Sequence, residues 1–60
     1  MNPVRVNCFA GGELDNFLLE HDRENKFVTI TELPEFEFYM SRDQLTEFIR
    51  LLNIRLEAIS

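Results

Sequence analysis

The sequence has few of the residues that stabilise very small proteins. Its 60 residues include one cysteine, one histidine and no tryptophan. A single cysteine excludes a disulfide within the chain and is typical of a reducing compartment. A chain of this length buries only about 60% of the surface that its unfolded form exposes, so it usually needs disulfides, a metal or self-association.

A structural metal is not expected either. Cys8 and His21 are the only thiol and imidazole, and the usual four-ligand zinc sites need more of these groups. A carboxylate site with Glu20, Asp22 and Glu24 around His21 is conceivable, but it lacks the glycine and the spacing of a calcium loop. We interpret these residues as part of a polar hairpin and expect no cofactor. Self-association is therefore the remaining route to stability.

Long apolar runs are absent as well. The longest uncharged apolar run falls far below the ~18 residues that a membrane-spanning helix needs. The amino-terminal stretch MNPVRVNCFAGG lacks the apolar core of a signal peptide. We therefore expect a soluble cytoplasmic protein that forms a single domain over residues 1–60.

Basic residues are scarce and unevenly placed. There are 6 lysines and arginines against 11 aspartates and glutamates, which gives a formal net charge of -5. Eight of the acidic side chains, but only two of the basic ones, lie between residues 13 and 37. A negative field repels phosphate backbones and attracts basic surfaces. Direct nucleic-acid binding is thus disfavoured, and a host protein with a basic surface is the favoured partner.

The first half of the chain has the pattern of antiparallel strands. Residues 4–10 alternate with the period of two that strands show. Gly11 and Gly12 can supply the positive φ of a tight turn, and residues 16–21 predict a second strand. Residues 22–26 form a polar connection of hairpin length.

Two further strands are expected before a helix. Residues 26–33 are rich in β-branched and aromatic side chains, which favours a strand. Pro34 has no amide hydrogen to donate and therefore interrupts the pairing. The alternation then resumes in residues 35–40, with one face toward the helix and the other toward solvent. The expected inner face is Phe36, Phe38 and Met40, and the outer face is Glu35, Glu37 and Tyr39.

Ser41 is predicted to be the N-cap of the helix. Its hydroxyl can accept the amide hydrogen of the third helical residue, where Gln44 completes a capping box. The negative charge of Asp43 in the first turn interacts favourably with the positive end of the helix dipole. No glycine or proline follows before Ile59. The sequence therefore predicts an α+β fold. A small antiparallel sheet of three or four strands, in the order β-β-β-β-α, packs against one C-terminal helix.

The predicted helix has apolar residues on two sides, at about 100° per residue. The stripe expected to cover the sheet consists of Leu45, Phe48, Ile49, Leu52, Leu56 and Ile59. A second set, projecting roughly opposite, consists of Leu51, Ile54 and Ala58. Loops, the N-terminal strand or another chain must cover this second side. We favour a homodimer in which Leu51, Ile54 and Ala58 form the interface, because few residues remain for wrapping.

Catalysis has little support in the sequence. Cys8 and His21 are the only conventional nucleophile and base, and a cysteine within a strand is usually a small buried apolar group. One small sheet with one helix rarely forms a cleft of the ~300 Å³ typical of ligand sites. Gly11 and Gly12 are not a phosphate loop, since no Lys-Ser/Thr follows. We expect no enzymatic activity and no catalytic residues.

The candidate binding surface is the acidic edge of the sheet. Glu35, Glu37 and Tyr39 are predicted to face outward, with Glu32 near them across the turn at Pro34. One interpretation is that the carboxylates merely keep this exposed edge from pairing with other sheets. Alternatively, they bind a basic patch, with Tyr39 as an anchor of the kind enriched in interfaces. Carboxylates about 6.7 Å apart along a strand can also imitate a nucleic-acid backbone.

The leading hypothesis is a protein-binding module, acting as a homodimer, that inhibits or regulates a host protein through Glu32, Glu35, Glu37 and Tyr39. In its small size, acidity and single cysteine, the chain resembles the accessory proteins that phages and mobile elements encode against host enzymes. One alternative is a structural subunit whose main function is oligomer formation. Another is a weak nucleic-acid-binding protein that uses Arg42, Arg50 and Arg55 of the helix.

Overall fold

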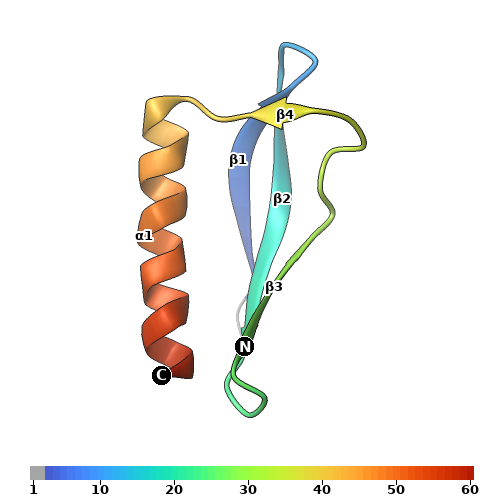
Figure 1. Ribbon diagram of the computed structural model, residues 1–60. Helices are drawn as coiled ribbons and strands as arrows, with labels where there is room; N and C mark the ends of the chain where they lie inside the picture. The colour runs from blue at the N-terminus through green and yellow to red at the C-terminus, as the bar shows by residue number, and fades with distance from the viewer. Residues whose placement is uncertain (1–2) are drawn as a thin grey trace.

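The computed structural model describes residues 3–60. The first two residues, which begin the stretch examined for an export signal, lie outside the described part. The elements follow the order β1 (Val4–Ala10), β2 (Glu13–Asp22), β3 (Phe27–Thr31), β4 (Phe38–Tyr39) and α1 (Arg42–Ile59). The sheet order is β3-β2-β1-β4, and α1 lies along one face of the sheet (Figure 1). All three pairings are antiparallel, which confirms the predicted α+β class with one C-terminal helix.

The β1–β2 hairpin forms as its glycine pair predicts. Ala10 pairs with Glu13, so only Gly11 and Gly12 connect the strands. Their φ angles are 61° and 79°, a left-handed conformation that matches the twist of two-residue hairpins. A Cβ at either position would meet no atom within 4 Å, so the backbone conformation is what favours glycine.

The β2–β3 hairpin is organised by Asp22. One oxygen of its carboxylate accepts the backbone N–H groups of Glu24, at 3.0 Å, and Asn25, at 3.1 Å. Its other oxygen accepts the side-chain amide of Asn25 at 2.8 Å. Lys26 adopts a φ of 60° and donates its N–H to the carbonyl of Asp22. The polar connection predicted at residues 22–26 is thus confirmed.

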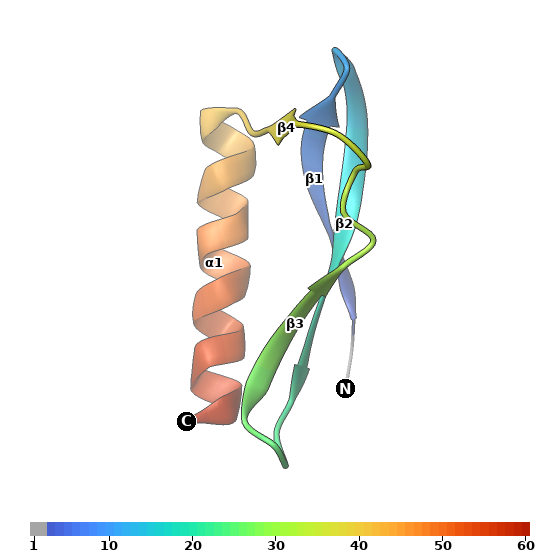
Figure 2. The same ribbon diagram turned by 45° about the vertical axis from the view of Figure 1, so that its right-hand side comes forward.

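The strand predicted over residues 35–40 is much shorter in the structure. Only Phe38–Tyr39 pair with β1, opposite Ala10 and Phe9. Because β3 and β4 lie at opposite edges of the sheet, residues 32–37 must cross it, and they do so on the side away from α1 (Figure 2). The prediction that Phe36 faces the helix is wrong, since its side chain is 82% exposed in this crossing segment.

The core lies between α1 and the facing side of the β1–β2 hairpin. Its fully buried side chains are Val6, Cys8, Phe17 and Leu19. The ring of Phe17 contacts those of Phe38 and Phe48, with centroids 5.7 and 5.3 Å apart. The core thus joins β1, β2, β4 and α1. Around it pack the half-buried side chains of Val4, Val28, Phe38, Met40, Phe48, Leu51 and Leu52.

The start of α1 agrees with the sequence prediction. The hydroxyl of Ser41 accepts the N–H of Gln44 at 3.1 Å, and the Gln44 side chain accepts the N–H of Ser41 at 2.9 Å. Both halves of the capping box are therefore present.

The face by which α1 meets the sheet differs from the prediction. Leu45, Ile49 and Leu56, expected to cover the sheet, are 47%, 50% and 60% exposed. Leu51, expected at a dimer interface, packs against the core of its own chain. Arg55 is buried, which shows that the helix turns a partly polar side toward the sheet.

The other two residues of the predicted interface occupy different environments. Ala58 is half-buried, whereas Ile54 is 45% exposed. The three residues therefore do not form one uncovered surface. The reason is again the buried Arg55. Phe48 and Leu52 of the predicted stripe do pack against the core, but apolar periodicity leaves Arg55 out and so rotates the expected packing face toward Leu45, Ile49 and Leu56.

Candidate functional site

The outer face of the sheet, away from α1, carries an apolar cluster at its β4 end. Phe9 pairs with Leu14 on one side and Tyr39 on the other. Since Cys8 points into the core, its neighbour Phe9 projects to the opposite face. The rings of Phe9 and Tyr39 have centroids 5.9 Å apart. Phe9 is half-buried, whereas Leu14 is 68% and Tyr39 is 52% exposed.

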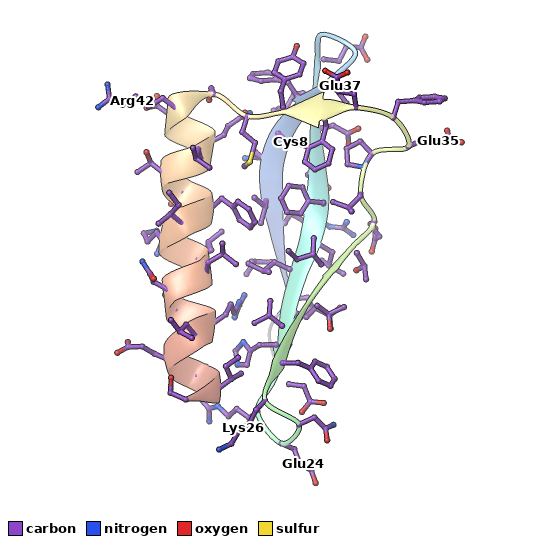
Figure 3. The ribbon with its side chains drawn as sticks, viewed as in Figure 1. Cys8, Glu24, Lys26, Glu35, Glu37 and Arg42 are labelled. Atoms are coloured by element: carbon purple, nitrogen blue, oxygen red, sulfur yellow. The ribbon has the colours of Figure 1, made fainter. Side chains whose placement is uncertain are left out.

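Two carboxylates and a third aromatic residue precede Tyr39 in the chain. Glu35, Phe36 and Glu37 are all exposed. Figure 3 shows Glu35 and Glu37 on the segment that enters β4, at the opposite end of the molecule from Glu24. Neither carboxylate forms an ion pair with any residue of the described part of the chain. We call this set the acidic–aromatic surface. It comprises Phe9, Leu14, Glu35, Phe36, Glu37 and Tyr39.

Glu32, the fourth residue predicted for partner binding, has a different environment. Its carboxylate lies 2.7 Å from Nη1 of Arg5, in an ion pair whose side chains are both 54% exposed. Such exposed pairs stabilise a fold by about 0–1 kcal/mol. The guanidinium nevertheless neutralises the charge locally, so we leave Glu32 out of the acidic–aromatic surface.

Imitation of a nucleic-acid backbone depended on strand geometry that is absent here. Glu35 and Glu37 precede β4 and lie in the crossing segment, without the regular spacing of alternate strand residues. The fixed repeat of carboxylates proposed from the sequence is therefore not formed by these two side chains.

A shallow hollow lies between β1 and the first turns of α1. It has a volume of about 190 Å³ and is lined by Asn7, Asp43, Gln44 and Glu47. The carboxylate of Glu47 also accepts two hydrogen bonds from Arg50, at 2.6 and 2.8 Å, which hold the pKa of Glu47 below its ordinary value. The volume is smaller than the ~300 Å³ at the lower end of small-molecule sites.

The cysteine and the histidine are far apart. Cys8 pairs with Asp15, and His21 lies six residues further along β2, a distance of about 20 Å at the rise of an antiparallel strand. Burial, and then the carboxylate of Asp15, raise the pKa of the Cys8 thiol. These two side chains cannot act together as nucleophile and base.

His21 is held against α1 by a buried contact. Nη1 of Arg55 lies 3.2 Å from Nδ1 of His21, and both residues are buried. Since the guanidinium can only donate, Nδ1 must accept and the imidazole is neutral. Burial lowers the pKa of His21, and the charges of Arg55 and Arg23 lower it further, while Asp22 acts in the opposite direction.

The residues weighed as a metal site point to different sides of β2. His21 faces α1, so its strand neighbours Glu20 and Asp22 project from the opposite face. Asp22 is further engaged by the backbone of the β2–β3 turn. In the described part of the chain, no three His, Cys, Asp or Glu side chains are grouped as a metal site would require.

The arginines of α1 do not share a surface. Arg55 is buried beside His21, and Arg50 is paired with Glu47. Arg42 projects away from the sheet at the start of the helix (Figure 3). The three guanidinium groups proposed as a nucleic-acid site therefore lie in three environments.

Comparison with known proteins identifies no relative of this chain. No family model matches the chain, and no curated protein or solved structure does. Within residues 3–60, no helix combines the length and apolar character that crossing a bilayer requires. Functional inference therefore depends on the geometry of the surfaces.

Proposed function

We propose that this chain is a non-enzymatic protein-binding module that uses the acidic–aromatic surface to bind a basic, partly apolar surface of another protein. The observation that carries the proposal is the exposure of Phe36, Leu14 and Tyr39, at 82%, 68% and 52%, together with two carboxylates that form no ion pair within residues 3–60. Scattered apolar residues are ordinary on protein surfaces, but Leu14, Phe9 and Tyr39 are neighbours in the sheet, and an apolar group bordered by charge is typical of an interaction site.

The aromatic side chains contribute mainly to affinity, and the carboxylates contribute mainly to the rate of encounter and to selectivity. Aromatic residues bury large areas at a low entropic cost and dominate the affinity of many interfaces. Tyr39 is also fixed by β4 pairing and by its contact with Phe9, so little further ordering is needed. The carboxylates of Glu35 and Glu37 attract a basic partner, accelerate encounter and select against acidic surfaces.

The consequence for the partner is competition. A basic surface on an intracellular protein commonly binds an anionic ligand such as nucleic acid. Occupation by the acidic–aromatic surface would exclude that ligand, so we propose the role of an inhibitor or regulator. This role uses surface complementarity and requires no cleft and no catalytic group.

The test is affinity capture from a host lysate followed by measurement of affinity with the purified captured protein. The binding variants are Phe36→Ala and the double variant Glu35→Gln/Glu37→Gln. The matched control is Glu24→Gln/Glu57→Gln, which changes the net charge equally but lies at the other end of the molecule, where Figure 3 places Glu24 and Figure 1 the C-terminus.

We expect Phe36→Ala to weaken binding about tenfold or more, as truncation of an aromatic anchor does. The double glutamine variant should bind more slowly and lose much of the salt dependence, because screening acts on exposed charges. The control should behave as the original protein does. Equal affinity and equal salt dependence in all variants would contradict the proposal.

A further inference from the structure

The exposed apolar residues of α1 lie on a single line. Leu45, Ile49 and Leu56 fall within about 40° of one another at 100° per residue. Together with the half-buried Leu52 they repeat at intervals of four, three and four residues, the spacing of a coiled-coil seam. We call these four residues the helix stripe. It lies beside the face that packs on the sheet, and its residues Leu45, Ile49 and Leu56 are 47%, 50% and 60% exposed.

Four of the charged residues of α1 lie away from the helix stripe. Asp43, Glu47, Arg50 and Glu57 all lie about 80° or more around the axis from any stripe residue. The exposed residues that border the stripe on its solvent side are Thr46 and Asn53, which are uncharged. An uncharged border fits an uncharged apolar occupant, and a second copy of the same stripe has that character.

Arg42 decides the direction of such a pairing. It precedes Leu45 by three residues and continues the stripe at its N-terminal end. In a parallel pair, the two copies of Arg42 would face each other across the seam and repel. In an antiparallel pair, each Arg42 would lie beside the last turn of the other helix. That turn has no basic residue of its own to balance the negative end of the helix.

We infer that α1 self-associates through the helix stripe, as an antiparallel pair in which Leu45 faces Leu56 and Ile49 faces Leu52 of a second copy. Arg42 of each copy lies at the C-terminal end of the opposite helix. This interface is separate from the acidic–aromatic surface and does not depend on the function proposed for it. It also replaces the interface of Leu51, Ile54 and Ala58 expected from the sequence.

The test compares two exposed isoleucines on opposite sides of α1. Ile49 is 50% and Ile54 is 45% exposed, so glutamate at either position should disturb the monomer equally. Sedimentation equilibrium at concentrations up to about 500 μM would report mass, and circular dichroism would report helix content. We expect Ile49→Glu to abolish the dimer and Ile54→Glu to leave it intact, with helix content unchanged in both.

The direction is tested by disulfide trapping, since Cys8 is buried and does not compete. The Leu45→Cys/Leu56→Cys double variant should form covalent dimers under mild oxidation, whereas Leu45→Cys alone should not. Efficient cross-linking of Leu45→Cys alone would overturn the antiparallel arrangement. A monomeric original protein, a dimer insensitive to Ile49→Glu, or a stripe that binds only a different protein would each overturn self-association.

Discussion

At the scale of single residues, the two groups best suited to chemistry have structural roles. Cys8 is fully buried between the sheet and α1, and His21 accepts a hydrogen bond from buried Arg55. The expected burial of the cysteine is confirmed. The pairing of His21 with Arg55 was not predicted, because residues 34 positions apart meet only through the tertiary fold.

The His21–Arg55 contact makes stability depend on pH. The folded pKa of His21 is lowered from 6.5, mainly by burial and by Arg55, so protons bind more readily to the unfolded chain. The contribution of neutral His21 to the free energy of unfolding is therefore fully present above about pH 6.5, and it is lost as the pH falls toward the folded pKa. We predict that the Tm, followed by circular dichroism, decreases between pH 7.5 and pH 5.5.

The control is His21→Asn, which keeps an acceptor for Arg55 but cannot be protonated. Its Tm should change little between pH 7.5 and pH 5.5. The lowered pKa values of Asp22 and Glu47, from 3.8 and 4.5, act only at more acid pH and do not interfere. An equal decrease in Tm for both proteins would show that another group is responsible.

The burial of Cys8 predicts low reactivity toward thiol reagents. Its side chain is fully inaccessible and its pKa is raised, so the folded state presents no accessible thiolate. With a stability of 3–5 kcal/mol, typical of so small a domain, labelling should be roughly a hundredfold or more slower than in denaturant. The rate can be followed by mass spectrometry. Equal rates with and without denaturant would contradict the described core.

At the scale of elements, the parts defined by local chemistry are predictable from sequence. The Gly11–Gly12 turn and the capping box of Ser41 and Gln44 depend on neighbouring residues alone, and both are present. The strand at residues 35–40 and the packing face of α1 depend on distant partners. The length of the strand is limited because only Phe38 and Tyr39 pair with β1. The packing face of α1 is set by the contact between Arg55 and His21.

The candidate site was only partly predictable for the same reason. Exposure of Glu35, Glu37 and Tyr39 follows from their polarity and is found in the structure. The addition of Leu14 and Phe9 to the surface requires the register of three strands. The alternation in residues 4–10 did place Phe9 opposite Cys8, which was the available signal.

The capping box predicts a measurable contribution to stability. Ser41→Ala removes the acceptor for the N–H of Gln44 and should destabilise the fold by about 0.5–2 kcal/mol. A urea titration followed by circular dichroism would measure the lower midpoint. Thr46→Ala is the matched control within the helix, because its hydroxyl only bonds back to Arg42 and alanine favours helices. A larger loss from Thr46→Ala than from Ser41→Ala would contradict this role.

At the scale of the whole molecule, the two surfaces proposed for association lie on different elements. The acidic–aromatic surface lies on the outer face of the sheet, and the helix stripe lies on α1, which covers the other face. Fully burying a Leu or Ile side chain contributes about 1.5–3 kcal/mol. A dimer would bury the exposed half of Leu45, Ile49 and Leu56 in each of its two copies. That gain of roughly 5–9 kcal/mol is comparable with the cost of association, so a dimer that dissociates on dilution is expected.

Dimerisation would also supply the stabilisation that the chain lacks from disulfides. Because only the folded chain can dimerise, the Tm should rise with protein concentration. The same contact would bring two acidic–aromatic surfaces into one assembly, which increases avidity for a partner with repeated sites.

Sedimentation equilibrium of the unmodified protein over a range of concentrations is the most direct measurement. The monomer has a mass of 7.1 kDa. The helix stripe predicts an average mass that rises toward twice this value as the concentration enters the range of tens to hundreds of micromolar, roughly where a weak interface is half-populated. A mass that stays at 7.1 kDa up to about 500 μM would contradict self-association through α1.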